Sequence, residues 1–341
     1  MDLTDHIAVW QQNVNKSQVC QHNILSNNKL VSKGISIIAL QEPAIDANGF
    51  TLASKDWMPI YPTLYHKTDS TTRAVMLIRA SIKTDSWKQL DFPSSDVTVI
   101  QVKGEWGKLT VFNIYNDCHN DDTIRLLTNF HNSNQAELTQ VTSGMAHILW
   151  VGDFNRHHPY WDDPRDSRLF TTDATAAMEK LIEAIADIGL DLALPSSILT
   201  HMHNVTKLWS RLDQVFISDH SKSLLIACDT QPDHRGINTD HLPILTELNL
   251  QVDVAPEEEI YNFCKVDWDK FRKELSTQLA KLPPPIPIDN QRQLNDACNS
   301  LTKAIQRTIV KQVPVTIISP KSKRWWTKEL MQLHQLANKL G

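Results

Sequence analysis

The sequence contains no apolar run of the roughly 18 to 20 residues that a membrane-spanning helix needs. Its start, MDLTDHIAVWQQ, lacks the basic region and apolar segment of a secretory signal. The five cysteines are odd in number, widely scattered and never in CxxC spacing, so neither a disulfide framework nor a structural zinc site is indicated. We therefore expect an intracellular protein with reduced thiols and no membrane partner.

The sequence also has no excess of basic residues over acidic ones. The formal net charge is -5, so no global basic field can hold nucleic acid, and such binding has to come from local patches. An acidic protein that acts on a polyanion points to a divalent cation between the two. With 341 residues, 41% of them hydrophobic, the chain is long enough for one large domain or two smaller ones.

Short apolar runs recur through the first 250 residues, and each ends in a polar cluster. Clear helical periodicity is rarer. Eight strands against three helices predict two sheets packed face to face with helices outside, rather than one doubly wound sheet. The predicted strands are 6–13, 34–42, 74–80, 97–103, 108–116, 147–153, 211–218 and 243–250, and the predicted helices are 18–31, 121–141 and 173–189.

The composition changes after about residue 253, where we place a domain boundary. The segments WDKFRKELSTQLAKL and NQRQLNDACNSLTKAIQRTIVKQV predict two amphipathic helices separated by a proline-rich turn. Their apolar stripes need a partner surface, which the preceding domain or the helices themselves could supply. Beyond them, Trp325 and Trp326 stand beside Lys321, Lys323 and Arg324, where they could stack on bases or pack on another domain.

Polar side chains gather where the predicted strands of the first 250 residues end or begin. On an α/β scaffold such positions carry catalytic groups. Taken singly, each residue has a structural alternative such as capping a turn or filling the core. The set comprises Asn13, Glu42, Tyr115, Asn116, Asp153, Asn155, Asp213, Thr239, Asp240 and His241.

Two adjacent histidines, His157 and His158, lie near Asp162 and Asp163 and resemble metal ligands. Adjacent residues of an extended segment point in opposite directions, and no third ligand has a recognisable spacing. The spacing therefore favours a loop that folds back onto the strand ends, with Trp161, over a zinc site.

The motifs resemble, in order, those of the endonuclease/exonuclease/phosphatase superfamily. They are an Asn after the first strand, LQEP, NIYND, GDFN, SRLDQVF and TDHLPI, and they cover residues 1 to about 250. GDFNRHH followed by a Trp, together with LQEP and SRLDQVF, is most similar to the endonuclease domain of fungal non-LTR (LINE-type) retrotransposons. In the tail, SKRWWTKEL resembles the segment that links such a domain to a reverse transcriptase, a domain that this sequence does not contain.

The resemblance implies an α/β fold, the four-layer sandwich of deoxyribonuclease I, over residues 1–253, with a C-terminal helical extension over 254–341. It also implies a Mg²⁺-dependent DNA endonuclease, with Mn²⁺ as a substitute ion, that nicks one strand. A reverse transcriptase domain would be a partner in a full-length element. Because the substrate would be genomic, we expect a nuclear location.

The resemblance further implies the metal ligands. Mg²⁺ is a hard ion that prefers carboxylate and water oxygens, so one or two acids suffice to hold it against a phosphate. Glu42 is the expected main ligand, supported by Asn13 and Asp240.

The resemblance assigns the chemistry to the other motif residues. Asp153 would orient and deprotonate the attacking water, and Asn155 and Tyr115 would donate hydrogen bonds to the phosphate or the leaving oxygen. His241, held in one tautomer by Asp213, would contact a non-bridging oxygen.

Substrate contacts are expected at Thr200, Thr239 and Arg156. The core motifs specify phosphoester hydrolysis better than they specify the substrate, because the superfamily also contains abasic-site endonucleases and phosphatases. Such an enzyme is one alternative. The other is a catalytically silent transposon remnant that serves as a binding module.

Overall fold

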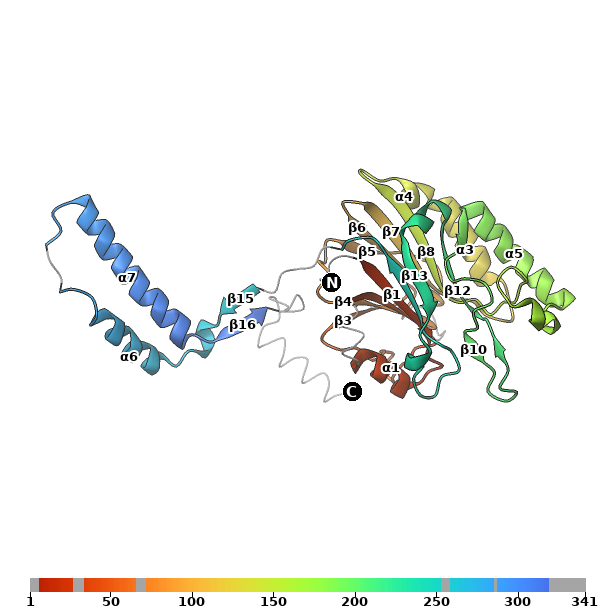
Figure 1. Cartoon of the computed structure of the whole chain (residues 1–341), viewed down its shortest axis with the longest axis horizontal. Helices are drawn as coiled ribbons and strands as arrows, with labels where there is room; N and C mark the ends of the chain where they lie inside the picture. The colour runs from red at the N-terminus through yellow and green to blue at the C-terminus, as the bar shows by residue number, and fades with distance from the viewer. Residues whose placement is uncertain (1–5, 27–33, 66–71, 253–257, 285–286, 319–341) are drawn as a thin grey trace. The chain divides into compact units, whose positions relative to one another are not determined.

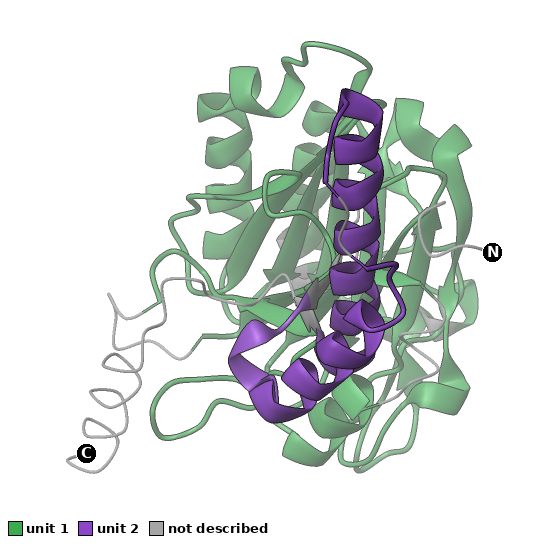
Figure 2. Cartoon of the chain, turned by 90° about the vertical axis from the view of Figure 1, so that its left-hand side faces the viewer, with its two compact units in different colours: residues 1–255 green, residues 256–341 purple. Residues whose placement is uncertain are grey.

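The computed structural model describes residues 6–26, 34–65, 72–252, 258–284 and 287–318. The chain divides into two compact units, Met1–Ala255 and Pro256–Gly341, which are coloured green and purple in Figure 2. Within the described residues, no helix combines the length and the apolar character that crossing a membrane requires.

Unit 1 is built on two six-stranded sheets (Figure 1). Strands β1 and β2 pair in parallel in the first sheet, as do β7 and β8 in the second, and the other neighbours in both sheets are antiparallel. The first sheet has the order β13 (Leu225–Thr230), β14 (Ile244–Leu248), β1 (Ile7–Asn13), β2 (Ile35–Gln41), β4 (Ala74–Arg79) and β3 (Trp57–Ile60). The second has the order β5 (Trp87–Leu90), β6 (Val97–Gly104), β7 (Gly107–Tyr115), β8 (Met145–Asp153), β12 (Asp213–Ser218) and β9 (Leu190–Leu192).

Helices cover the outer faces of both sheets. Helix α1 (Gln18–Ser26) packs on the first sheet, whereas α3 (Asp122–Ser133), α4 (Gln135–Thr139) and α5 (Thr172–Ile188) cover the second. The predicted four-layer α/β sandwich is thus confirmed. Two short strands, β10 (His201–Met202) and β11 (Trp209–Ser210), form a separate hairpin, and the 3-10 helices of the unit are η1 (Pro164–Leu169), η2 (Asp219–Leu224) and η3 (Pro232–His234).

Apolar side chains point to both faces of the central strands and form three buried layers, one between the sheets and one on the outer face of each sheet. In β1, Ile7 and Val9 face the second sheet, whereas Ala8 and Trp10 face α1, as the two-residue period of a strand requires. On the far side of the second sheet, Trp150 is fully buried among aromatic residues and the inner faces of α3 and α5. Burial on both faces of the central strands explains why they read as nearly continuous apolar runs.

All eight predicted strands are present, with ends that differ from the prediction by at most two residues. The helix predicted over 121–141 is broken at Asn134 into α3 and α4, and the helix predicted over 18–31 is described as far as Ser26. The sequence analysis missed β3, β5, β9 and β13. Each of these four is an edge strand of its sheet.

Unit 2 contains a two-stranded ribbon of β15 (Glu258–Tyr261) and β16 (Val315–Ile318), which the sequence analysis missed. Helix η4 (Phe263–Lys265) follows the first strand, and α6 (Trp268–Leu279) packs on α7 (Gln291–Gln312), so both predicted helices are present. Trp325 and Trp326, with the basic residues beside them, lie outside the described residues.

Candidate active site

The two sheets bring their polar strand ends to one rim of the sandwich. Because β1 is parallel to β2 and β7 to β8, the residues at the ends of these strands lie side by side. Strands β14 and β12 run antiparallel to them, so their first residues reach the same rim. The rim therefore gathers the six motifs, which contribute Asn13, Glu42, Tyr115, Asp153, Asp213 and Thr239–His241.

Asp153, Asp213 and His241 form the buried centre of this rim. The Nδ1 atom of His241 lies 2.8 Å from Oδ2 of Asp213, which fixes the imidazole ring. Its Nε2 atom lies 4.0 Å from Oδ2 of Asp153. Asn13 Nδ2 donates to the same Asp153 oxygen at 2.9 Å, and the backbone N–H of Asn155 donates to the other at 3.1 Å. Both carboxylate oxygens of Asp153 are therefore oriented.

Burial and the charges of neighbouring groups together set the protonation states of this centre. Burial raises the pKa of Asp153 to about 7, an effect that His241 opposes and Asp213 strengthens. Burial alone would lower the pKa of His241, but the neighbouring carboxylates, Asp213 foremost, outweigh it and raise this pKa to about 9. At neutral pH the imidazole therefore carries a proton on both nitrogens and can donate to an anion. Asp153 has a pKa suited to accepting a proton near pH 7.

Glu42 lies beyond the last residue of β2 in a strained backbone conformation. Its φ of 44° is rare for a residue other than glycine. Two backbone hydrogen bonds hold it, from Glu42 N to Arg73 O and from Lys16 N to Glu42 O, both at 2.8 Å. Asn155, beyond β8, has a similar φ of 49°. Backbone strain of this kind, about 1–3 kcal/mol per residue, is concentrated at functional sites.

The oxygen atoms at this rim fit a hard divalent cation. Glu42 offers a carboxylate. The amide oxygen of Asn13 accepts from the backbone N–H of Asn15 at 2.9 Å, and its second lone pair remains for an ion, whereas its nitrogen donates to Asp153. Negative charge is in excess here, since the carboxylates of Glu42 and Asp153 add to burial in raising the pKa of Tyr115. Asp240 instead faces His201 and His241, so its role as a Mg²⁺ ligand stays a prediction.

Arg73 is a member of the rim that the sequence analysis missed. Its guanidinium makes two hydrogen bonds to Asp96, at 2.8 and 2.7 Å, and one to Asp117 at 2.7 Å. The guanidinium carbon also lies 4.6 Å from the centre of the Tyr115 ring. Arg73 thus contacts Tyr115 by a cation–π interaction and Glu42 by a backbone hydrogen bond, and so links these two rim residues. No motif marks Arg73, because a lone basic residue before a strand carries no local signal.

Three residues that the sequence analysis assigned to substrate contact have buried side chains with other partners. Thr200 Oγ1 accepts from the backbone N–H of Asp213 at 3.1 Å, and Thr239 Oγ1 donates to the carbonyl of Asn13 at 2.8 Å. Arg156 donates to the carbonyl of Asn120 at 2.8 Å and to the carboxylate of Asp121 at 3.1 Å. Their contact with substrate stays a prediction, and the structure gives each a positioning role.

The side chain of Asn155 is engaged in the same loop. Its Nδ2 donates to the carbonyl of Asn116 at 2.9 Å, and Asn116 Nδ2 donates to the carbonyl of Phe154 at 2.8 Å. One hydrogen of the Asn155 amide is thus used to fix the loop after β8. The second hydrogen remains for the predicted bond to a phosphate oxygen.

His157 and His158 take part in fixing a loop. His157 Nδ1 lies 3.4 Å from Asp162, and the backbone N–H of His158 donates to the same carboxylate at 2.8 Å. Trp161 is fully buried against Phe216. Among the described residues, neither histidine belongs to a group of three possible metal ligands.

A buried polar layer beneath the rim joins the two sheets, and sequence reasoning did not identify it. Gln11 Nε2 of the first sheet donates to the carbonyl of Gly152 in the second, at 2.9 Å. Asn113 Nδ2 of the second sheet donates in return to the carbonyls of Leu40 and Val75, both at 3.0 Å. A side chain at Gly152 would meet Ile114 O at 1.9 Å, so only glycine lets β8 approach β7 next to Asp153.

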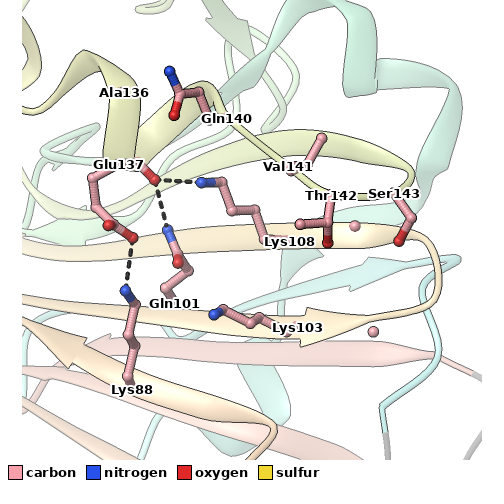
Figure 3. Close-up of a pocket in the computed structure, with 12 residues that line it drawn as sticks. Lys88, Gln101, Lys103, Lys108, Ala136, Glu137, Gln140, Val141, Thr142 and Ser143 are labelled. Carbon is pink, nitrogen blue, oxygen red and sulfur yellow. Dashed lines mark hydrogen bonds and ion pairs between the residues drawn. The ribbon is translucent and has the colours of Figure 1, made fainter.

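Two hollows lie at different distances from this rim. A pocket of about 400 Å³ is lined by His201, whose ring lies against that of His241, and by residues of the β10–β11 hairpin. Another, of about 390 Å³, includes Gly107 and Lys108 at the opposite end of β7. Figure 3 shows Lys88 and Lys108 meeting Glu137 there. The second hollow contains none of the motif residues and is separate from the candidate site.

Comparison with known proteins finds a family match that covers part of the rim. Residues 109–245 match the family model described as "Endonuclease-reverse transcriptase". The resemblance to endonucleases of this superfamily is confirmed. The matched stretch contains Tyr115, Asp153, Asp213 and His241, whereas Asn13 and Glu42 precede it. No curated protein matches the chain.

Solved structures of the same fold are similar at low sequence identity. The endonuclease domain of TRAS1, a telomere-specific non-LTR retrotransposon, is 14% identical with a TM-score of 0.52, over 72% of this chain and 99% of that domain. An AP endonuclease from Leishmania major is 12% identical with a TM-score of 0.58, over 75% and 90% of the two chains. The 3' phosphatase NExo from Neisseria, bound to product DNA hairpin, is 17% identical with a TM-score of 0.52, over 71% and 98%. These likenesses establish the fold of unit 1.

Proposed function

We propose that the chain is a divalent-metal-dependent phosphodiesterase that nicks one strand of DNA. The observation that supports the proposal most strongly is that hydrogen bonds hold Asp153 and His241 in fixed orientations at the rim. Asp153 is hydrogen-bonded by Asn13 and lies 4.0 Å from the imidazole of His241, which Asp213 holds in place. The match to an endonuclease family over residues 109–245 agrees with this chemistry.

The arrangement can perform an in-line displacement at phosphorus. Asp153 accepts the proton of a water molecule as that water attacks, and Asn13 and the Asn155 N–H keep the carboxylate aimed. Protonated His241 donates to a non-bridging oxygen, where negative charge grows in the transition state. The bond between phosphorus and the 3′ oxygen breaks, and the leaving oxygen takes up a proton from solvent, which leaves a 3′-hydroxyl on the nicked strand.

Glu42 and Asn13 would hold the metal ion, with Mg²⁺ as the first candidate and Mn²⁺ as a substitute. When bound, such an ion supplies charge neutralisation for the phosphate and the leaving oxygen. Tyr115, stacked under Arg73, stays protonated because burial and nearby carboxylates raise its pKa, so its hydroxyl can donate to the substrate.

The contacts at the rim specify the type of reaction more closely than they specify the substrate. Proteins of this fold include the AP endonuclease and the 3' phosphatase described above, so an abasic-site or phosphatase activity is the second candidate. A DNA substrate in the genome would place the protein in the nucleus, and a reverse transcriptase would be its partner in a longer element. The family model carries both activities in its name.

Conversion of supercoiled plasmid to the nicked form, measured against Mg²⁺ concentration, tests the proposal. Wild-type protein should nick only with added divalent ion, and Glu42→Gln should need a higher Mg²⁺ concentration because a charged ligand is lost. An identical titration curve for the variant would show that the ion binds elsewhere. A duplex with one abasic site, or a 3′-phosphate duplex, cleaved in preference to plasmid would favour the second candidate.

A further inference from the structure

A second imidazole stands against the catalytic one. His201, on β10, faces His241 with ring centres 4.7 Å apart, and the carboxylate of Asp240 lies near the Nε2 atoms of both rings. His201 Nε2 is 3.6 Å from one carboxylate oxygen of Asp240, and His241 Nε2 is 3.8 Å from the other. These distances exceed those of hydrogen bonds. Two imidazole nitrogens and a carboxylate therefore converge on one point, all within 4.8 Å of one another.

The backbone holds this cluster in place. His201 and His241 form an antiparallel β-bridge. Its hydrogen bonds run from Met202 N to Asp240 O at 2.9 Å and from Leu242 N to the carbonyl of the residue before His201 at 2.7 Å. The three side chains thus belong to β10 and to the segment that precedes β14, which these bonds fix to each other.

Each imidazole uses its other nitrogen for an outer contact. His241 Nδ1 is paired with Asp213 at 2.8 Å, and His201 Nδ1 lies 3.2 Å from Ser210 Oγ. In metal sites, histidine ligands present one nitrogen to the ion and donate the other N–H to a carboxylate or hydroxyl, which fixes the ring. Both histidines of this cluster follow that pattern, with Nε2 directed at Asp240, and an ion would displace the proton from Nε2 of His241.

The donor set selects the kind of ion. Two imidazoles and one carboxylate are ligands of zinc and related transition metals, whereas Mg²⁺ prefers oxygen. A tetrahedral ion with bonds of about 2.0–2.1 Å places its ligand atoms about 3.3–3.5 Å apart. The two Nε2 atoms lie 3.6 and 3.8 Å from different oxygens of Asp240, so binding one ion requires the side chains to shift until the two rings share one carboxylate oxygen. The adjoining pocket, which His201 lines, gives an ion a route to the cluster.

We propose that His201, Asp240 and His241 bind a transition-metal dication of the zinc type, and that the bound ion inhibits the nuclease. Inhibition follows because the ion occupies His241 Nε2, the atom that would otherwise donate to the phosphate. Its imidazole donors distinguish this site from Glu42 and Asn13, which offer Mg²⁺ only oxygen, although Asp240 is also a predicted Mg²⁺ ligand. Binding of the ion is independent of the proposed function, whereas inhibition rests on it.

A rival cluster exists within the described residues. Asp117, Cys118 and His119 are consecutive and lie in an exposed loop, and their side chains also come within 4.8 Å of one another. Asp117 is already paired with Arg73 at 2.7 Å, and no strand fixes the other two side chains. This cluster supplies the matched control for a binding experiment.

The test is calorimetric titration of Zn²⁺ into chelator-treated, full-length protein without DNA, repeated with Co²⁺ and read by visible absorbance. Wild-type protein should bind one equivalent, and His201→Ala should weaken the affinity by about 100-fold or more because a ligand is lost. Ser210→Ala should weaken it by about 10-fold because the ring loses its outer partner. His119→Ala should bind as wild type does.

The same variants then separate binding from inhibition. Zn²⁺ should suppress Mg²⁺-dependent nicking by wild-type protein and by His119→Ala, whereas His201→Ala should nick without zinc and resist its suppression. The proposal is overturned if the wild-type protein does not bind zinc. It is also overturned if His119→Ala loses zinc binding while His201→Ala keeps it. If circular dichroism shows that His201→Ala does not fold, Ser210→Ala replaces it, and an affinity for zinc equal to that of the wild type would then overturn the proposal. Zinc binding by a protein that nicks no DNA would contradict the proposed function alone.

Discussion

The two units of the chain bury their side chains to very different extents. In unit 1, the large side chains of Trp10, Trp150 and Trp161 are fully buried. In unit 2, by contrast, α6 has no buried residue, and Trp268 and Val310 are 49% and 69% exposed. Amphipathic periodicity predicts helices in both units. The helices of unit 1 pack on its sheets, whereas in the described part of unit 2 α6 and α7 pack on each other.

Local signals account for the helices of unit 2. Asp267 caps α6 by accepting hydrogen bonds from the N–H groups of Asp269 and Lys270, and Asn290 caps α7 in the same way from Gln293. Lys311 and Glu274 join the two helices at 2.7 Å. In unit 1, packing between distant segments sets the structure, and the chemistry is built on that packing. We therefore expect the two units to respond very differently to the same kind of change.

The largest expected difference concerns the core. Trp150→Ala should lower the free energy of unfolding by about 3–5 kcal/mol, because it removes a fully buried aromatic side chain from the second sheet. Leu301→Ala in α7, where the side chain is 48% exposed, should change it by no more than about 0.5 kcal/mol. Urea denaturation followed by circular dichroism measures both. Equal losses would contradict the contrast between the units.

The next expected effect lies at the rim of unit 1. Asp213→Asn should slow nicking by about 100-fold or more at neutral pH, because the ring of His241 loses the charge that holds it. Since that charge raises the pKa of His241 to about 9, its removal lowers the pKa. The alkaline fall of the rate should therefore move to lower pH.

Rates from pH 6 to 10 measure this shift. Asp219→Asn is the control, because its side chain is 77% exposed at the start of η2. An alkaline limb that stays in place in Asp213→Asn would show that His241 does not set it.

The smallest expected effect is that of losing unit 2. Removing residues 256–341 should leave the nicking rate within about threefold, equivalent to about 0.6 kcal/mol, because all the motif residues lie before that point. Plasmid nicking by the truncated and full-length chains makes the comparison. A truncated chain that folds by circular dichroism and yet does not cut would show that unit 2 completes the site or grips DNA.

Sequence reasoning recovered the central strands and failed at the edges of the sheets. Strands buried on both faces read as continuous apolar runs, so β1, β2, β7 and β8 were found. The edge strands β3, β5 and β9 have only three or four residues, and β13 is largely exposed, so none of the four shows a clear apolar run.

The candidate site shows the same division. Residues at strand ends, such as Asp153 and Glu42, could be named because their motifs are local. Arg73, Asn113 and His201 could not, because their roles depend on contacts across the two sheets or with a separate hairpin. Thr200 and Arg156 are buried and hydrogen-bonded to the backbone, which gives them positioning roles. No sequence pattern reveals these roles.

The central claim is that the rim of unit 1 hydrolyses DNA through Asp153, and plasmid nicking by Asp153→Ala tests it most directly. With Mg²⁺ present, the variant should lose measurable nicking and keep the circular dichroism spectrum of the wild type, while Asp122→Ala, whose side chain is 66% exposed, should nick normally. Activity of Asp153→Ala within about tenfold of wild type, or about 1.4 kcal/mol of barrier, would contradict the account.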